Sequence, residues 1–278
     1  MDNQRPTIHI VGLFCSKNKS KRGEKLIYPV IDGAESFFIK GNSAGLLLSH
    51  GFLGTPQSVK DLGEQFAELG YTVYAPRLKG HGTHYKDVEK ATHEEWLSDL
   101  EKGYKRLKRH CSVIYVVGQS MGGTLAILLA NKQQGIDGLI LINAALSVPS
   151  YESLRNQITP RYIEESKPDI KKQGVVEITY SKVPLRSIHQ LQRLMNKITV
   201  EELRNVKIPL LSFKSLEDHV VPPENTDYIM QHVSSLKKRS ISLSDSFHVA
   251  SMDNDKNKII RKTHAYIQEN LQGTEISV

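Results

Sequence analysis

The segment Val113–Gly123, VIYVVGQSMGG, carries the strongest structural signal in the chain. Its first five residues form a continuous apolar run rich in β-branched side chains, which is typical of a strand buried on both faces of a parallel sheet. The next five residues fit the pattern G-x-S-x-G, and small residues suited to close helix packing follow them. A strand, a tight turn at Ser120 and a helix together predict a nucleophilic serine at the carboxyl end of a strand.

The same pattern occurs a second time at Gly41–Gly45, with the sequence GNSAG. Here it lies between two apolar runs, residues 37–39 and residues 46–48, and no helical segment follows it. We therefore interpret Ser43 as a residue of a hairpin turn between two strands. The surrounding sequence selects Ser120 as the nucleophile candidate.

Outward from Ser120, strand-like and helix-like segments alternate along most of the chain. A helix start is indicated at Thr55-Pro56, where a capping residue precedes proline, and another at Thr92 with Glu95, which fit a capping box. This alternation predicts an α/β fold with a mostly parallel sheet flanked by helices. Further apolar runs that we interpret as buried strands lie at residues 46–48, 71–74, 139–142 and 208–213, and helices are expected near residues 187–197 and 255–271.

The alternation stops between about residues 147 and 205, where four prolines interrupt polar, helix-leaning sequence. This stretch is too short and too polar to bury a core of its own, so we interpret it as a cap insertion above the sheet. The expected organisation is a basic extension over residues 1–26 and one domain over residues 27–278.

The composition excludes several classes of protein. The 278 residues include 39% hydrophobic and 24% charged residues, which is typical of a soluble globular protein, and no apolar run is long enough to span a bilayer. The only cysteines, Cys15 and Cys111, are too few for a disulfide framework, so a cytoplasmic location is expected. The first 25 residues do not have the order of charged and apolar regions that a signal peptide needs.

The net charge of +7 is distributed unevenly. The first 25 residues contain six Lys or Arg and two Asp or Glu, a local net charge of +4. We interpret this segment as a solvated arm, with weak contact to an anionic membrane surface as the alternative. No combination of basic and aromatic residues indicates nucleic-acid binding.

A serine nucleophile needs a base and a group that orients the base, and this fold places them in the order serine, acid, histidine. Asp218 follows the strand expected at residues 208–213, and His248 precedes the last helix. Glu217 is the alternative acid. His81 and His219 fit the order less well, and we expect them in loop or supporting roles.

The transition state of acyl transfer also needs hydrogen-bond donors for an oxyanion. His50–Gly54, with the sequence HGFLG, joins a strand to a helix and is expected to supply the backbone N–H of Phe52. The second donor is expected to be the N–H of Met121. No metal-binding or phosphate-binding motif was found, so no metal and no cofactor are expected.

Several motifs together resemble the carboxylesterase and monoacylglycerol lipase branch of the α/β-hydrolases from bacilli. They are His50–Pro56 (HGFLGTP), Pro76–Tyr85 (PRLKGHGTHY), Gly118–Gly123, Asp218–Pro223 (DHVVPP) and His248–Ala250. The similarity extends over roughly residues 28–270. It implies an α/β-hydrolase fold with a small cap, and serine esterase activity on short- to medium-chain esters and monoacylglycerols in lipid metabolism.

The resemblance also implies roles for individual residues. It makes Ser120 the nucleophile, Asp218 the orienting acid and His248 the base, with Phe52 and Met121 as oxyanion donors. Glu177 resembles a family position that binds glycerol hydroxyls, the alternative being a solvated surface glutamate. Gln119 departs from the pattern, which often has Leu there, and we expect altered packing behind the nucleophile.

The predicted reaction is ester hydrolysis through an acyl-enzyme. Two alternatives remain open from the sequence. A peptidase or thioesterase would use the same fold and the same catalytic groups on a different acyl compound. A binding module without activity would keep the fold and lose the chemistry.

Overall fold

The structure, a computed structural model, describes residues 28–275, so the predicted basic extension lies outside the described residues. Seven strands form one sheet in the order β1-β3-β2-β4-β5-β8-β9, and every neighbouring pair is parallel except β1 with β3. The predicted α/β-hydrolase fold class is confirmed. The strands are β1 (Phe37–Ile39), β2 (Ala44–Ser49), β3 (Thr72–Ala75), β4 (Val113–Gln119), β5 (Gly138–Ile142), β8 (Leu210–Ser215) and β9 (Lys238–Leu243).

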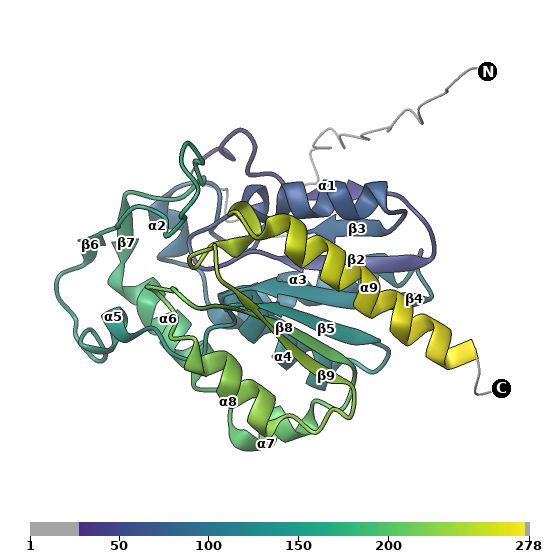
Figure 1. Ribbon diagram of the computed structural model, residues 1–278. Helices are drawn as coiled ribbons and strands as arrows, with labels where there is room; N and C mark the ends of the chain where they lie inside the picture. Colours follow the sequence, from purple (N-terminus) through teal and green to yellow (C-terminus); the bar gives the residue numbers. More distant parts are fainter. Residues whose placement is uncertain (1–27, 276–278) are drawn as a thin grey trace.

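Helices cover both faces of this sheet (Figure 1). Because successive side chains of a strand point to opposite faces, Val116 joins the core under one helix layer and Val117 joins the core under the other. The first layer contains α3 (His93–Leu107), α4 (Met121–Lys132) and α8 (Glu224–His232); the second contains α1 (Lys60–Glu68) and α9 (Lys256–Glu275). Burial on both faces explains why the strands are continuously apolar in sequence.

The predicted helix starts are confirmed at both positions. Thr55 accepts a hydrogen bond from the N–H of Gln57, although the first turn, η1 (Pro56–Val59), is a 3₁₀ helix that continues into α1. Thr92 and Glu95 form the expected capping box, each side chain accepting from the other residue's backbone N–H. These caps satisfy N–H groups that have no partner inside the helix.

The predicted hairpin at Ser43 is wrong. The turn does connect β1 to β2, but β3 lies between these strands in the sheet, and β1 pairs with β3. Asn42 stabilises the turn because its side chain accepts from the N–H of Ala44, and its backbone N–H donates to the carbonyl of Gly70. Short-range sequence therefore identified a turn but not the strands that pair beyond it.

The chain between β5 and β8 contains α5 (Pro149–Glu152), β6 (Tyr162–Glu164), β7 (Lys182–Pro184), α6 (Leu185–Met195) and α7 (Val200–Asn205). The helix expected near residues 187–197 is confirmed as α6, whose buried side chains join the core beneath α3 and α4. The two-stranded antiparallel sheet β6-β7 was not predicted, because each strand has only three residues. The interpretation of the whole segment as a cap stays a prediction.

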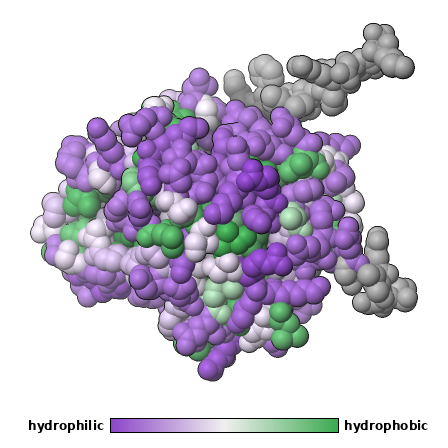
Figure 2. Space-filling model, viewed as in Figure 1, coloured by the Kyte–Doolittle hydropathy of each residue, from purple (hydrophilic) through white to green (hydrophobic). Residues whose placement is uncertain are grey.

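The molecular surface is mostly hydrophilic on the face drawn in Figure 2, where apolar residues occupy separate areas. Among residues 28–275, no helix combines the length and apolar character needed to cross a membrane. Two short elements complete the described fold: α2 (Tyr85–Val88) and η2 (Ala250–Met252).

Candidate active site

Ser120 lies in a tight turn between β4 and α4. Its φ of 55° and ψ of −120° fall in a region that non-glycine residues seldom adopt, at a cost of about 1–3 kcal/mol. Glycines make the turn sterically feasible, since a Cβ on Gly118 would lie 2.3 Å from the carbonyl oxygen of Gly122, and one on Gly122 would lie 2.3 Å from that of Ser49. The backbone N–H of Ser120 donates to the carbonyl of Ile142 on β5 at 2.9 Å, which fixes the turn against the sheet.

The structure brings Ser120, Asp218 and His248 together. Nε2 of His248 lies 2.9 Å from the Ser120 Oγ, and its Nδ1 lies 2.8 Å from Oδ2 of Asp218. The carboxylate of Asp218 can only accept, so Nδ1 carries the proton and Nε2 is left to accept from the serine hydroxyl. Asp218 Oδ1 accepts from the N–H groups of Val220 and Val221 at 2.9 and 2.8 Å, which fixes the carboxylate.

The competing residues point elsewhere. The Glu217 side chain is exposed and lies 3.5 Å from the ammonium of Lys171. His219 is exposed and pairs with Asp169, whereas His81 is buried among aromatic rings and has its pKa lowered well below the ordinary value by burial.

Two amide side chains hold the backbone of His248. The amide nitrogens of Gln119, at the end of β4, and of Asn143, just after β5, each donate to the His248 carbonyl at 2.8 Å. Gln119 thus has a specific hydrogen-bonding role at the position where the family pattern often has Leu. The role of Asn143 was not predicted, because nothing in its local sequence indicates a contact 105 residues away.

The loop His50–Gly54 packs directly against Ser120, since a Cβ on Gly51 would lie 3.3 Å from the Ser120 Cβ. Burial lowers the pKa of His50 to about 4, so its ring is neutral near pH 7. The Nδ1–H donates to the carbonyl of Gly51 at 2.9 Å, and Nε2 accepts from the N–H of Leu78 at 3.2 Å.

These hydrogen bonds fix the loop that carries Phe52. Within residues 28–275, the backbone N–H groups of Phe52 and Met121 have no hydrogen-bond acceptor. Both groups are therefore available to an added oxygen.

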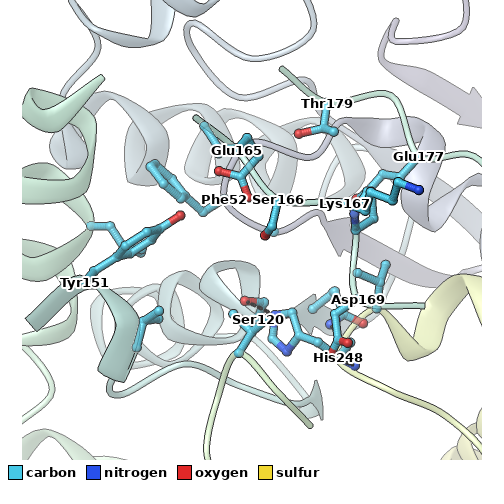
Figure 3. Close-up of a pocket in the computed structure, with 18 residues that line it drawn as sticks. Phe52, Ser120, Tyr151, Glu165, Ser166, Lys167, Asp169, Glu177, Thr179 and His248 are labelled. Carbon is cyan, nitrogen blue, oxygen red and sulfur yellow. Dashed lines mark hydrogen bonds between the residues drawn. The ribbon is translucent and has the colours of Figure 1, made fainter. Parts of the chain in front are cut away.

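A cavity of about 100 Å³ opens beside Ser120 and His248, and Figure 3 shows the side chains that surround it. Phe52 comes from the loop after β2, whereas Tyr151, Glu165 and Glu177 come from the segment between β5 and β8. The pocket therefore has one wall at the ends of the sheet strands and one wall made by the later segment.

Two half-buried carboxyl groups line the second wall. Burial, together with the nearby charge of Glu165, raises the pKa of Glu177 to about 7. Burial likewise raises the pKa of Glu165 to about 7. Glu177 was predicted to contact substrate from the family resemblance, whereas Glu165 was missed, because a glutamate in a polar segment resembles any surface glutamate.

No cluster of three or more His, Cys, Asp or Glu residues suited to a metal ion occurs within the described part of the chain. The polar side chains that line the pocket carry hydroxyl, imidazole, carboxyl, amide and ammonium groups. Such groups suit nucleophilic and acid–base chemistry.

A parallel sheet with a serine at a strained strand-to-helix turn and a histidine in contact with it defines an α/β-hydrolase of the serine type. The chain belongs to the family described as Hydrolase_4, serine aminopeptidase S33, which matches residues 41–255. Its identification as a serine hydrolase enzyme of the carboxylesterase and monoacylglycerol lipase branch is confirmed by its relatives.

One such relative is a thermostable monoacylglycerol lipase of Bacillus sp. strain H-257, which is 45% identical over 238 residues that cover 85% of this chain and 95% of the lipase. A carboxylesterase of Bacillus subtilis strain 168 is 24% identical, with 84% of this chain and 96% of the esterase covered.

Solved structures agree with these relatives. A structure reported for the metagenome-derived lipolytic enzymes LipS and LipT has a TM-score of 0.83 and 38% identity, and the match covers 87% of this chain and 100% of that one. The monoacylglycerol lipase of Paleococcus ferrophilus, at 17% identity and a TM-score of 0.69, shares the fold; 85% of this chain and 99% of that one are covered.

Proposed function

We propose that the enzyme hydrolyses carboxylic esters through a Ser-His-Asp triad and an acyl-enzyme. The observation that carries this proposal is the continuous hydrogen-bond chain from Ser120 through His248 to Asp218. His248 takes the proton of the Ser120 hydroxyl as Oγ attacks the ester carbonyl, and Asp218 stabilises the imidazolium that forms.

The backbone N–H groups of Phe52 and Met121 then bind the oxygen that becomes negative in the tetrahedral intermediate. Their lack of an acceptor in the described structure supports this role, because a preorganised donor needs no rearrangement during the reaction. His248 returns its proton to the leaving alcohol and afterwards activates a water molecule, which releases the acyl group from Ser120.

The proposed substrates are monoacylglycerols and short- to medium-chain esters. Monoacylglycerol is the substrate in the name of the relative at 45% identity. Glu177 lines the same cavity as Ser120, which supports a role for its carboxyl group in binding a glycerol hydroxyl while the ester carbonyl is at Ser120. A hydroxyl suits a carboxyl whose pKa is about 7, because both its protonated and ionised forms accept a hydrogen bond.

The chemistry needs no cofactor. A single domain over residues 27–278 with a cap insertion at about 147–205, and a cytoplasmic location, belong to the same proposal. The predicted weak contact of the basic arm with membrane surfaces concerns residues outside the described structure.

A substrate panel tests the proposed function. Turnover is measured for p-nitrophenyl esters and monoacylglycerols of increasing chain length beside aminoacyl amides and thioesters. The proposal expects esters to be turned over fastest. Faster hydrolysis of an amide or a thioester than of every ester would replace it with a peptidase or thioesterase. Failure of a fluorophosphonate probe to label the wild-type protein at Ser120 would indicate a binding module.

A further inference from the structure

The segment Asp169–Lys172, which follows β6 and precedes β7, contacts the loop that carries His248. Asp169 lines the pocket, and its side chain is only 16% exposed. It is labelled beside His248 in Figure 3. The segment between β5 and β8 therefore reaches the catalytic histidine itself as well as the pocket wall.

Asp169 accepts hydrogen bonds from both triad loops. Its Oδ2 accepts from the backbone N–H of His248 at 3.0 Å and from that of His219 at 3.1 Å. Its Oδ1 lies 2.8 Å from Nδ1 of His219, and its backbone carbonyl accepts from the N–H of Val249 at 3.0 Å. His219 directly follows Asp218 in the chain. Asp169 therefore contacts both the residue next to Asp218 and the backbone of His248.

A second carboxylate stabilises the same arrangement. Asp253 Oδ2 accepts from the N–H groups of Lys171 and Phe247 at 2.8 and 2.9 Å, and its Oδ1 accepts from that of Lys172 at 2.9 Å. The ammonium of Lys171 lies 3.4 Å from Asp245. The segment Asp169–Lys172 is thus held along its length against the His248 loop, and Asp169 makes the contact at the histidine.

The backbone of His248 is held from two sides. Gln119 and Asn143, from the sheet, donate to its carbonyl, whereas Asp169 accepts from its N–H. His248 lies in a loop, so no strand or helix ladder fixes its peptide groups. Removal of the Asp169 carboxylate would leave a partly buried N–H without a partner and would allow the loop to move. Displacement of the ring by about 1 Å from Ser120 costs roughly 100-fold in rate.

We propose that Asp169 is a positioning residue that holds the His248 imidazole in line between Ser120 and Asp218 by accepting from the His248 backbone N–H. The proposal rests on the proposed catalytic role of Ser120 and His248. It makes the segment between β5 and β8 part of the apparatus that orients the base, in addition to its place in the pocket wall.

Three variants separate this role from general stabilisation. Asp169→Ala removes the acceptor for the His248 N–H. Asp169→Asn keeps one side-chain oxygen that can accept from it but removes the charge. His219→Ala removes the outer partner of Asp169 and leaves the contact with His248 intact. Hydrolysis of p-nitrophenyl acetate, the rate of fluorophosphonate labelling of Ser120 and the melting temperature are measured for each.

We expect Asp169→Ala to lower kcat on the order of 10- to 100-fold, with KM changed by less than about twofold. Labelling slows in parallel, and the low-field proton NMR resonance of His248 Nδ1–H weakens, because that proton lies in the bond to Asp218. We expect kcat of Asp169→Asn to be within about threefold of wild type, and kcat of His219→Ala to be within about twofold. Both variants keep a side-chain oxygen at residue 169 that accepts from the His248 N–H.

Unchanged kcat and an unchanged NMR resonance in Asp169→Ala would overturn the proposal. So would an equal loss in Asp169→Asn and His219→Ala, which would show that the contact between His219 and Asp169 only stabilises the fold. If Asp169→Ala does not fold, Asp169→Ser, whose hydroxyl is too short to reach the N–H, takes its place under the same criteria. Failure of the proposed function would be seen in a separate measurement: the Ser120→Ala variant would then hydrolyse esters as fast as the wild type.

Discussion

The two walls of the active-site pocket are built by different means. Ser120, Asp218 and His248 follow strands of the central sheet, and each is held by several hydrogen bonds to neighbouring backbone or side chains. The opposite wall, from the segment between β5 and β8, presents Glu165 and Glu177 from short loops around a small sheet. We propose that the residues at the strand ends carry out the chemistry and that the later segment selects the substrate. The two walls meet at Asp169, which accepts from the backbone N–H of His248.

The largest effect is expected from Ser120→Ala, which removes the nucleophile. We expect kcat for every ester to fall by about 10⁶-fold, as in the loss of a triad serine elsewhere. Ser43→Ala, in the second G-x-S-x-G sequence, is the matched control and should leave kcat unchanged. Turnover is measured with p-nitrophenyl butyrate. A kcat in Ser120→Ala clearly above the level left by a loss of about 10⁶-fold would show that Ser120 is not the nucleophile.

A smaller loss is expected from Asp218→Asn. The asparagine can present an N–H to Nδ1 of His248, which would place the ring proton on the wrong nitrogen, and kcat should fall by about 10⁴-fold. Glu217→Gln, at the exposed neighbouring position, should leave kcat as it is. Steady-state kinetics on a short ester measure kcat for both variants. A large loss in Glu217→Gln with kcat unchanged in Asp218→Asn would show that Glu217 is the orienting acid.

Replacement of Glu177 sharpens the comparison, because it should change selectivity and leave the chemistry intact. We expect Glu177→Ala to lower kcat/KM for a monoacylglycerol by about tenfold, the scale of one hydrogen bond to a charged group. The methyl ester of the same fatty acid should be affected little, and the exposed neighbour Val176→Ala serves as control. Equal losses on both substrates would argue against a glycerol contact.

The two carboxyls should also make stability depend on pH. Their pKa values in the folded protein, about 7, exceed the ordinary value of 4.5, so between these values the folded state binds more protons than the unfolded state. Their contribution to stability is present below pH 4.5 and is lost as the pH rises through 7.

The melting temperature of the double variant Glu165→Gln, Glu177→Gln, measured relative to wild type, should therefore rise between pH 5 and pH 8. Two shifts of this size correspond to several kcal/mol, so the rise should be on the order of 10 °C. Thermal unfolding followed by circular dichroism measures it, with the exposed Glu164→Gln as control. A difference that stays constant with pH would show that the carboxyls titrate normally.

The smallest effect on turnover is expected from deletion of residues 1–25, which carry a net charge of +4. Hydrolysis of a water-soluble ester should stay at the wild-type rate, whereas sedimentation with anionic vesicles should decrease, and more so at low salt. Unchanged vesicle binding would reject a role for the arm at membrane surfaces.

The strand-end wall was accessible from sequence because its residues occupy recognisable local contexts. Ser120 follows a buried strand and precedes a helix, and Asp218 and His248 come at later strand ends in the order that this fold requires. Glu177 was accessible only through resemblance to a family. Glu165 and Asp169 had no signal, because a carboxylate in a polar segment is indistinguishable by local pattern from one in solvent.

The sequence by itself determined the α/β fold, the helix starts and the three residues of the proposed triad. Each depends on periodicity, capping or strand-end position, which act over a few residues. Only the tertiary structure decided that β3 separates β1 from β2, that β6 pairs with β7, and that Asp169 meets His248 across 79 residues of chain. Such pairings depend on how distant segments bury their surfaces and satisfy their hydrogen bonds together, and local sequence does not contain that information.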